Sequence, residues 1–94
     1  MSWYVYMVRC RDNSLYTGYT NDPQRRLAVH NSGNGAKYTR SRLPVELVYR
    51  EELPDKSAAL RREAALKKLS RRTKLELIAK AGTVAGSPAE QDTP

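Results

Sequence analysis

Apolar residues at the start of the chain are concentrated in two short runs. Residues 3–10 form a nearly continuous apolar and aromatic run, residues 15–20 form a second run, and the polar residues 11–14 lie between them. Runs of this length, rich in β-branched and aromatic residues and separated by turn residues, are typical of a β-hairpin. Because both faces of the first run are apolar, we expect it to be the central strand of a sheet.

The pattern then changes to that of a short helix. Asp22-Pro23 is a typical helix start, because a carboxylate can cap free backbone N–H groups and proline lacks the donor that the first turn leaves unpaired. We expect the helix to span residues 23–30. It should end in residues 31–35, where asparagine and glycine tolerate the left-handed backbone of a helix C-terminus.

A loop and a third strand should follow this helix. Residues 36–44 carry several polar and basic side chains and lead to a proline, so we expect a loop. Residues 45–53 alternate in part, with Val45, Leu47 and Tyr49 on one face, as in a strand with one wetter face. We expect this strand to lie at an edge of the sheet.

The C-terminal half has the composition of two helices and a tail. Residues 57–69 are rich in Ala, Leu, Arg and Lys, and Ser70 can cap a further helix over residues 71–81. Residues 83–94 are small and polar, so we expect a disordered tail after one domain of residues 1–82. The element order β-β-α-β-α-α predicts an α/β (α+β) fold, with a small three-stranded antiparallel sheet flanked by helices.

The charge balance narrows the class of partner. Lys and Arg number 17 against 10 Asp and Glu, which gives a formal charge of +7 and a pI near 9.9. Such a balance favours a polyanionic partner, with nucleic acid ahead of a membrane surface. The single Cys10 excludes an internal disulfide and is expected to be a buried structural residue. Without a signal peptide or membrane-span pattern, we expect a cytoplasmic protein.

Glu63 is the least expected residue of the first C-terminal helix. At 100° per residue it points near the middle of an apolar arc that contains Ala59, Leu60 and Leu66. An ionised carboxylate there is costly unless a cation meets it, and a divalent metal ion would do so. An ion pair with Lys67, one turn further along, is the simpler interpretation.

Arg26 and His30 are four residues apart and therefore share one face of the first helix. An arginine at the rim of a sheet could hold a phosphate with two parallel hydrogen bonds, and a histidine could move a proton near neutral pH. Taken singly, Arg26 also fits a solvated surface charge. His30 also fits a residue stabilised by the dipole at the helix C-terminus.

Tyr6 and Tyr16 lie on the two strands of the predicted hairpin. A tyrosine hydroxyl beside a metal ion or a guanidinium can act as a general base, although tyrosines on strands more often only pack. A two-residue loop at Asp12-Asn13 would place the two tyrosines on opposite faces, whereas a loop one residue longer or a bulge would bring them together. Gly18 interrupts the second strand and indicates close approach by a ligand or another backbone.

These residues together resemble the GIY-YIG nuclease family, and in particular its small stand-alone bacterial members of the UPF0213 type. Tyr4-Val5-Tyr6 stands where the family has Gly-Ile-Tyr, and Tyr16-Thr17-Gly18 stands where it has Tyr-Ile-Gly. The resemblance covers about residues 2–81. The remaining family positions, a catalytic arginine, a histidine one turn later and a metal-binding glutamate, match Arg26, His30 and Glu63.

The resemblance implies a nuclease that uses one Mg²⁺ or Mn²⁺ ion. In that scheme Glu63 holds the metal, Arg26 stabilises the phosphorane, and Tyr6 or Tyr16 helps to deprotonate water, with His30 assisting. Two departures from the family pattern stand out: Tyr4 replaces the first glycine, and no asparagine follows Glu63. The second departure raises the question of whether Lys67 or Lys74 replaces the missing polar group.

Basic residues occur in two groups that could bind a phosphate backbone. One group lies in the loop before the third strand and the other spans the two C-terminal helices, where Glu63 is the only acid between residues 61 and 74. Phosphate contacts of this kind position a substrate without specifying bases. The residues that we predict to bind nucleic acid are Lys37, Arg40, Arg42, Lys67, Lys68, Arg71, Arg72 and Lys74.

Three functions fit these features. The first is an endonuclease that acts on DNA and recognises a branch, flap or nick, since no separate base-reading domain is visible. The second is a nucleic-acid-binding module with the same fold and with weak or no catalysis, suggested by the missing asparagine. The third is an RNA- or ribosome-associated protein, which the charge alone would allow but which we rank below DNA.

Overall fold

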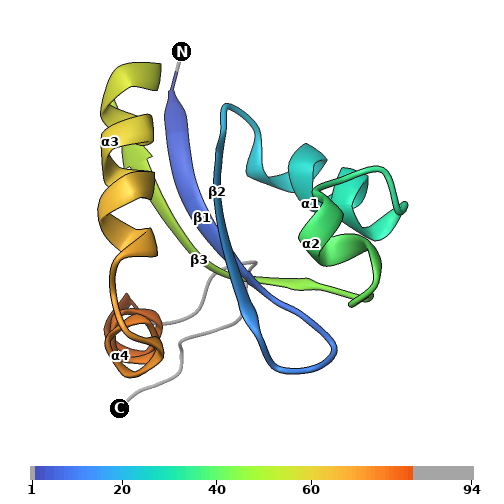
Figure 1. Ribbon diagram of the computed structural model, residues 1–94. Helices are drawn as coiled ribbons and strands as arrows, with labels where there is room; N and C mark the ends of the chain where they lie inside the picture. The colour runs from blue at the N-terminus through green and yellow to red at the C-terminus, as the bar shows by residue number, and fades with distance from the viewer. Residues whose placement is uncertain (1, 82–94) are drawn as a thin grey trace.

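The two apolar runs form the predicted hairpin. In the computed structural model, which describes residues 2–81, β1 (Trp3–Arg9) pairs antiparallel with β2 (Leu15–Thr20) (Figure 1). The hairpin closes through the Cys10 N–H, which donates to the Ser14 carbonyl at 2.8 Å. Asn13 has a φ of 69°, a left-handed conformation that asparagine tolerates better than most residues. The loop is therefore one residue longer than the two-residue alternative.

The third strand completes a small antiparallel sheet. β3 (Glu46–Leu53) pairs with the other side of β1, so the strand order is β2-β1-β3, with β1 central and β3 at an edge as predicted. A register shift between Met7 and Val8 places Leu47 opposite Val8 and Tyr49 opposite Met7. The prediction that Leu47 and Tyr49 share a face is therefore wrong, because one extra residue in a bulge reverses the alternation of side chains.

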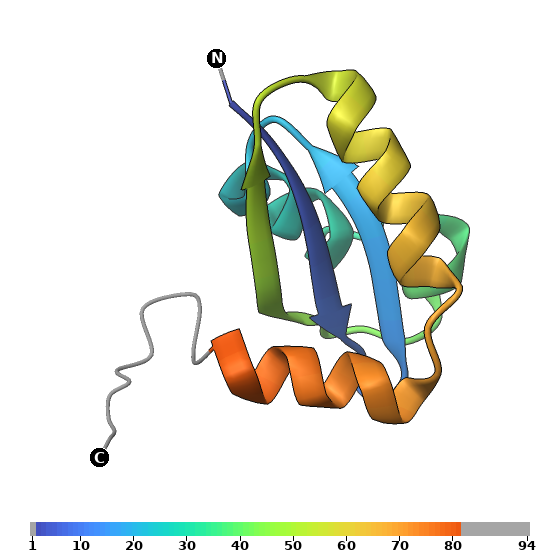
Figure 2. The same cartoon turned by 90° about the vertical axis from the view of Figure 1, so that its left-hand side faces the viewer.

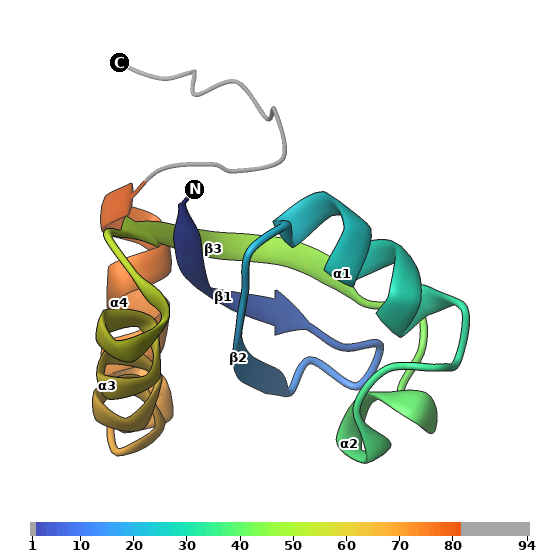
Figure 3. The same cartoon turned by 90° about the horizontal axis from the view of Figure 1, so that it is seen from above.

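Helices cover both faces of the sheet. α1 (Pro23–Asn31) and α2 (Lys37–Arg40) lie on one side, and α3 (Lys56–Lys67) and α4 (Arg71–Ala81) on the other (Figures 1 and 3). Figure 2 shows α3 running along the sheet and α4 crossing near the end of β1. This arrangement confirms the predicted fold class, with α2 as an additional short helix.

Local sequence explains where these helices begin. The Asp22 carboxylate accepts a hydrogen bond from the Arg25 N–H at 3.1 Å, and the Asp55 carboxylate accepts one from the Ala58 N–H at 2.8 Å. Side-chain caps of this kind stabilise a helix by about 1 kcal/mol. With Asp55 as its cap, α3 begins one residue earlier than predicted, and it ends at Lys67 rather than at residue 69.

The segment expected to be a loop before β3 contains α2. The Ala36 carbonyl accepts from the backbone N–H groups of Thr39 and Arg40, at 3.1 and 3.2 Å, which closes one helical turn. The turn is too short to produce a helical hydrophobic period, so the sequence pattern did not reveal it. The predicted disordered tail, residues 83–94, lies outside the described residues.

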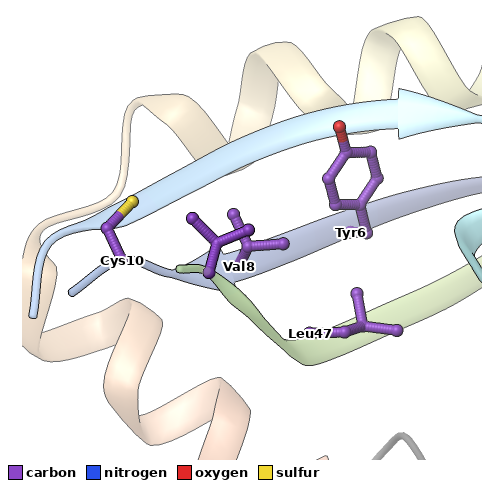
Figure 4. Close-up of a cluster of buried hydrophobic side chains, with 5 residues drawn as sticks. Tyr6, Val8, Cys10 and Leu47 are labelled. Carbon is purple, nitrogen blue, oxygen red and sulfur yellow. The ribbon is translucent and has the colours of Figure 1, made fainter. Parts of the chain in front are cut away.

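Two hydrophobic clusters lie on the two faces of the central strand. On the α1 side, Tyr6, Val8 and Cys10 of the hairpin pack with Leu47 (Figure 4). On the α3 side the cluster consists of Val5, Met7, Tyr49 and Leu66. Cys10 is a free cysteine with 3% of its surface exposed, so its environment agrees with the expected structural role.

Candidate active site

The hairpin register brings Tyr6 and Tyr16 to the same face of the sheet. Tyr6 pairs with Gly18, and Tyr16 lies two residues before Gly18 on β2, so both side chains point to the α1 side. A Cβ atom on Gly18 would lie 2.6 Å from the Tyr6 hydroxyl, closer than unbonded atoms can approach. The interruption at Gly18 is therefore explained by the Tyr6 side chain, which lies across the strand at this point.

Tyr6 is hydrogen-bonded into a buried network with His30 and Thr39. The Tyr6 hydroxyl lies 2.9 Å from His30 Nε2, and His30 Nδ1 lies 2.8 Å from Thr39 Oγ1. The Thr39 hydroxyl donates its own proton to the Ala36 carbonyl at 3.0 Å, so its oxygen accepts from Nδ1–H. A neutral imidazole carries one proton; Nε2 is therefore the acceptor, and the Tyr6 hydroxyl donates to it.

Burial sets the protonation states of this network. His30 has no exposed surface, and its burial, with a smaller effect of the Arg26 charge, holds the pKa of the imidazole below 6.5. Burial raises the pKa of Tyr6 above 10, and the neighbouring Arg26 guanidinium offsets part of this effect. At neutral pH an un-ionised tyrosine therefore donates to a neutral histidine, whose Nε2 lone pair lies in line to receive its hydrogen bond.

Sequence reasoning missed two residues that hold His30. Thr39 is fully buried in α2 and fixes the imidazole tautomer, yet in the sequence it is one polar residue in an apparent loop. Gly35 also permits this packing, because a Cβ atom there would lie 2.4 Å from His30 Nδ1. His30 thus lies behind Tyr6 in the protein interior and not at an exposed helix end.

A pocket of about 350 Å³ joins the other predicted site residues. Arg26 reaches it from α1 and Glu63 from α3, so helices on opposite faces of the sheet meet around the β2 edge. Tyr6 and Tyr16 also line the pocket. Its other lining residues are Trp3, Gly18, Tyr19, Thr20, Asn21 and Lys56.

Both interpretations of Glu63 have a counterpart in the structure. Its side chain is 16% exposed, lines the pocket, and lies with Oε2 3.4 Å from Lys67 Nζ. Lys67 is half exposed, at 53%, on the adjacent turn of α3. The carboxylate is therefore partly desolvated and already has one cation beside it.

The donor set around Glu63 suits a single magnesium ion. Glu63 is the only carboxylate among the residues that line the pocket, and residues 2–81 contain no cluster of three or more His, Cys, Asp or Glu side chains suited to a metal. Mg²⁺ is commonly held by one or two carboxylates, with water and substrate phosphate oxygens as the remaining ligands. The pocket fits this type of site and does not fit a cage built from protein ligands alone.

The basic residues predicted to bind nucleic acid lie on both sides of the sheet. Lys37 and Arg40 belong to α2, and Arg42 follows it, while Lys67, Lys68, Arg71, Arg72 and Lys74 belong to the α3–α4 region. Arg42 is engaged within the protein, with its guanidinium 4.0 Å above the Tyr38 ring and its Nε 3.1 Å from Asp12. The lysine that reaches the pocket is Lys56, which the sequence reasoning did not select.

Comparison with known proteins identifies the class. The model of the GIY-YIG catalytic domain matches residues 2–76, and the chain belongs to this family. The match indicates nuclease-type chemistry and contact with nucleic acid, and members of the family typically use a divalent metal ion.

Similar proteins carry the name UPF0213. One from Staphylococcus haemolyticus is 57% identical over 75 residues, which are 80% of this chain and 92% of that protein. One from Natronomonas pharaonis is 55% identical over 76 residues, 81% of this chain and 89% of that protein. The solution structure of a UPF0213 protein from Bacillus halodurans is similar with a TM-score of 0.56 at 47% identity, covering 95% of this chain and 90% of that one.

The basic charge of the chain would also suit a membrane surface, which we ranked below nucleic acid. Among residues 2–81, no helix combines the length and the apolar character that crossing a bilayer requires.

Proposed function

We propose that this protein is a Mg²⁺-dependent endonuclease that hydrolyses phosphodiester bonds of DNA. The observation that carries the proposal is the pocket at the β2 edge, where Arg26 from α1, Glu63 from α3, and Tyr6 and Tyr16 from two strands of the sheet line one space. The pocket offers a cation for a phosphate, a carboxylate for a metal ion, and a hydroxyl backed by a proton acceptor. Phosphodiester hydrolysis requires these three functions together.

The proton path follows from the buried network. A water molecule attacks the phosphorus and gives its proton to the Tyr6 oxygen, while the Tyr6 proton passes to His30 Nε2 over their 2.9 Å hydrogen bond. We assign Tyr6 this role in preference to Tyr16, because Tyr6 has an acceptor positioned behind it. Tyr16 packs edge-on against the His30 ring, with centroids 5.5 Å apart, and helps to hold the imidazole in place.

Arg26, and a metal ion held by Glu63, would stabilise the negative charge that develops on the phosphate during hydrolysis. Arg26 donates hydrogen bonds to the phosphate oxygens as negative charge grows on them, and its approach from α1 places it beside Tyr6. Glu63 would hold Mg²⁺, which when bound stabilises negative charge on the phosphate and on the departing oxygen. The leaving oxygen takes its proton from solvent, because the pocket opens at the edge of the sheet.

Substrate binding rests on the excess of basic residues. The helices on both sides of the β2 edge carry lysines and arginines, so a nucleic-acid strand that crosses this edge meets cations before and after the pocket. Such contacts bind the backbone and make affinity fall steeply with salt. We propose selectivity for branched, flapped or nicked DNA, since backbone contacts respond to shape rather than to base sequence.

One contact favours a second candidate function, a DNA-binding module with weak or no catalysis. Lys67 Nζ lies 3.4 Å from Glu63 and could neutralise the carboxylate in place of a metal ion. The family asparagine after Glu63 is also missing. A protein of this kind would bind DNA with a steep salt dependence and cut none of the substrates tested.

Cutting assays with matched variants separate the two candidates. Wild type should cut branched, flapped or nicked DNA with Mg²⁺ and not with EDTA, and Glu63→Gln should lower the rate by at least about 100-fold, the usual cost of losing one transition-state charge partner. Glu51→Gln is the matched control, since Glu51 is a part-buried carboxylate bonded to Arg62 on the other sheet edge. Cutting that survives Glu63→Gln would refute a nuclease site built on Glu63. DNA binding without any cutting by wild type would select the binding module.

A further inference from the structure

Trp3 and Tyr19 form an aromatic pair in the wall of the same pocket and have no part in the proposed chemistry. They lie on the neighbouring strands β1 and β2, with ring centroids 6.1 Å apart and planes inclined at 35°. Both are half-buried, and neither belongs to the two hydrophobic clusters of the described residues. Part of the aromatic surface therefore faces the pocket and is not needed for the core.

Lys56 lies over the Trp3 ring of this pair. It is the first residue of α3, it is exposed, and its Nζ lies 5.7 Å from the centre of the Trp3 ring. Among residues 2–81, Lys56 has no acidic side chain within ion-pair distance, unlike Lys67. The pocket thus has an aromatic surface and an unpaired ammonium group at one end, in addition to Arg26 and Glu63.

From this arrangement we infer that Trp3, Tyr19 and Lys56 form a subsite for one unpaired nucleotide next to the phosphate that is cut. The base stacks on the Trp3–Tyr19 pair, and the exposed Lys56 side chain swings off the Trp3 ring to bind a phosphate that flanks the base. Aromatic side chains with nearby cations are the usual platform for single-stranded nucleic acid, because every base has a flat face that can stack. The inference rests on the proposed nuclease function and defines its substrate more closely.

The size and position of the pocket limit what can bind. Its volume of about 350 Å³ is near the lower end of the roughly 300–1,000 Å³ range of small-ligand sites, which suits one nucleotide rather than a length of duplex. A base within a duplex has both faces covered by its neighbours and cannot lie on Trp3. The substrate is therefore a strand with an unpaired nucleotide beside the cleavage point, as in a flap or a frayed end.

The fluorescence of Trp3 reports this contact directly, because Trp3 is the only tryptophan of the chain. In EDTA, where no cutting occurs, a single-stranded oligodeoxynucleotide of about six nucleotides should quench the emission as a base stacks on the ring. An oligomer of abasic deoxyribose phosphates with the same charge should bind the basic surface and leave the emission unchanged. Equal quenching by both oligomers would overturn the inference.

Affinities of variants supply the second measurement, by fluorescence anisotropy of a labelled single strand. Trp3→Leu and Tyr19→Leu should each lower the affinity by about 5- to 100-fold, the range expected for loss of one base–aromatic stack. Trp3→Phe retains an aromatic ring and should bind nearly as wild type. Thermal melting followed by circular dichroism identifies a variant that fails to fold, and Tyr19→Leu, which retains Trp3, then provides the decisive value. Wild-type affinity in folded Trp3→Leu would overturn the inference.

These results are separate from the test of the nuclease itself. If wild type cuts DNA but no base-dependent quenching occurs, the subsite is wrong and the nuclease stands. If bases quench Trp3 and no DNA is cut under any condition, the nuclease is wrong and the stacking site stands. A flap substrate should also be bound more tightly than a blunt duplex by wild type, and Trp3→Leu should abolish that preference.

Discussion

The two edges of the sheet carry the same three residue types in different arrangements. At the β3 edge, Arg62 Nε donates to Glu51 Oε1 at 2.8 Å, and the Tyr49 hydroxyl donates to the same oxygen at 3.3 Å. The arginine, glutamate and tyrosine satisfy one another, and burial, with a smaller effect of the Glu51 charge, raises the pKa of Tyr49. This set stabilises the fold and leaves no charge for a ligand.

At the β2 edge neither the arginine nor the tyrosine is paired with the glutamate. Arg26 and Glu63 come from helices on opposite faces of the sheet, and within residues 2–81 Arg26 has no acidic partner at ion-pair distance. Tyr6 donates to His30 instead of to a carboxylate. The same residue types therefore serve different purposes at the two edges. Opposite charges that pair with each other stabilise the fold, whereas charges that line a pocket can bind a ligand.

The largest expected effect is on the proton acceptor. Tyr6→Phe removes the hydroxyl that passes a proton to His30, and the rate of DNA cutting should fall by about 100- to 10,000-fold, the usual contribution of general base catalysis. Tyr49→Phe, the matched change at the β3 edge, should leave the rate unchanged. Rates would be measured under single-turnover conditions. A folded Tyr6→Phe protein with the wild-type rate would remove Tyr6 from the mechanism.

The next effect concerns the two arginines. Arg26→Lys retains the charge but loses the planar, two-pronged donor, so cutting should fall by about 100- to 1,000-fold. Arg62→Lys should affect stability rather than rate, with a loss of about 1 kcal/mol in the free energy of unfolding, since a part-buried hydrogen bond is weakened. Urea unfolding and single-turnover cutting measure the two effects. Equal losses of activity in both variants would contradict the distinction between the edges.

Gly18 tests how closely the two strands approach at the site. A Cβ atom on Gly18 would meet the Tyr6 hydroxyl at 2.6 Å, and the buried Tyr6 side chain could move aside only by disturbing the packing around it. Gly18→Ala should lower the free energy of unfolding by about 1–3 kcal/mol, the cost of overpacking, and should slow cutting by displacing Tyr6. Gly33→Ala is the matched control: nothing lies within 4 Å of the added Cβ atom, but Gly33 has a φ of 86°, so the variant should also lose stability while the rate of cutting stays unchanged. A stable, active Gly18→Ala protein would show that Tyr6 tolerates displacement.

The smallest effect is the pH dependence of stability. Folded His30 has a pKa below 6.5, and the unfolded chain has the ordinary value. As pH falls through 6.5 the unfolded state gains a proton that the folded state does not, so the free energy of unfolding decreases and levels off below the folded pKa. His30→Gln, which removes the only histidine, should flatten this decrease. Unfolding curves from pH 7 to pH 5 in both proteins would show it, and identical slopes would contradict the buried neutral imidazole.

Sequence patterns predicted the three strands, the three longer helices and the family, and they supplied a set of candidate site residues that stays a prediction. The strands followed from apolar runs, α1 from Asp22-Pro23, α3 from a segment rich in Ala, Leu, Arg and Lys, and the family from short motifs around Tyr6, Tyr16 and Glu63. These signals are local, or they repeat with the period of a strand or helix. The sequence also defined the alternative registers of the hairpin, although only the structure could choose between them.

Features that depend on contacts between distant segments were not visible in the sequence. The bulge in β3 places Leu47 and Tyr49 on opposite faces of the sheet, and the composition of the strand does not indicate it. Thr39 becomes part of the site only because α2 folds back beneath His30. Lys56 reaches the pocket because α3 packs against β1 and β2, a contact between segments that no sequence motif marks.

The central claim is that the β2 edge holds one divalent ion through Glu63. The direct measurement is the number of Mn²⁺ ions bound to the complex of the protein with a non-cleavable phosphorothioate DNA, counted by electron paramagnetic resonance. The complexes of wild type and of Glu51→Gln should each bind one more ion than the DNA alone, and the complex of Glu63→Gln should bind no more ions than the DNA alone. An extra ion that remains in Glu63→Gln, or none in wild type, would contradict the account.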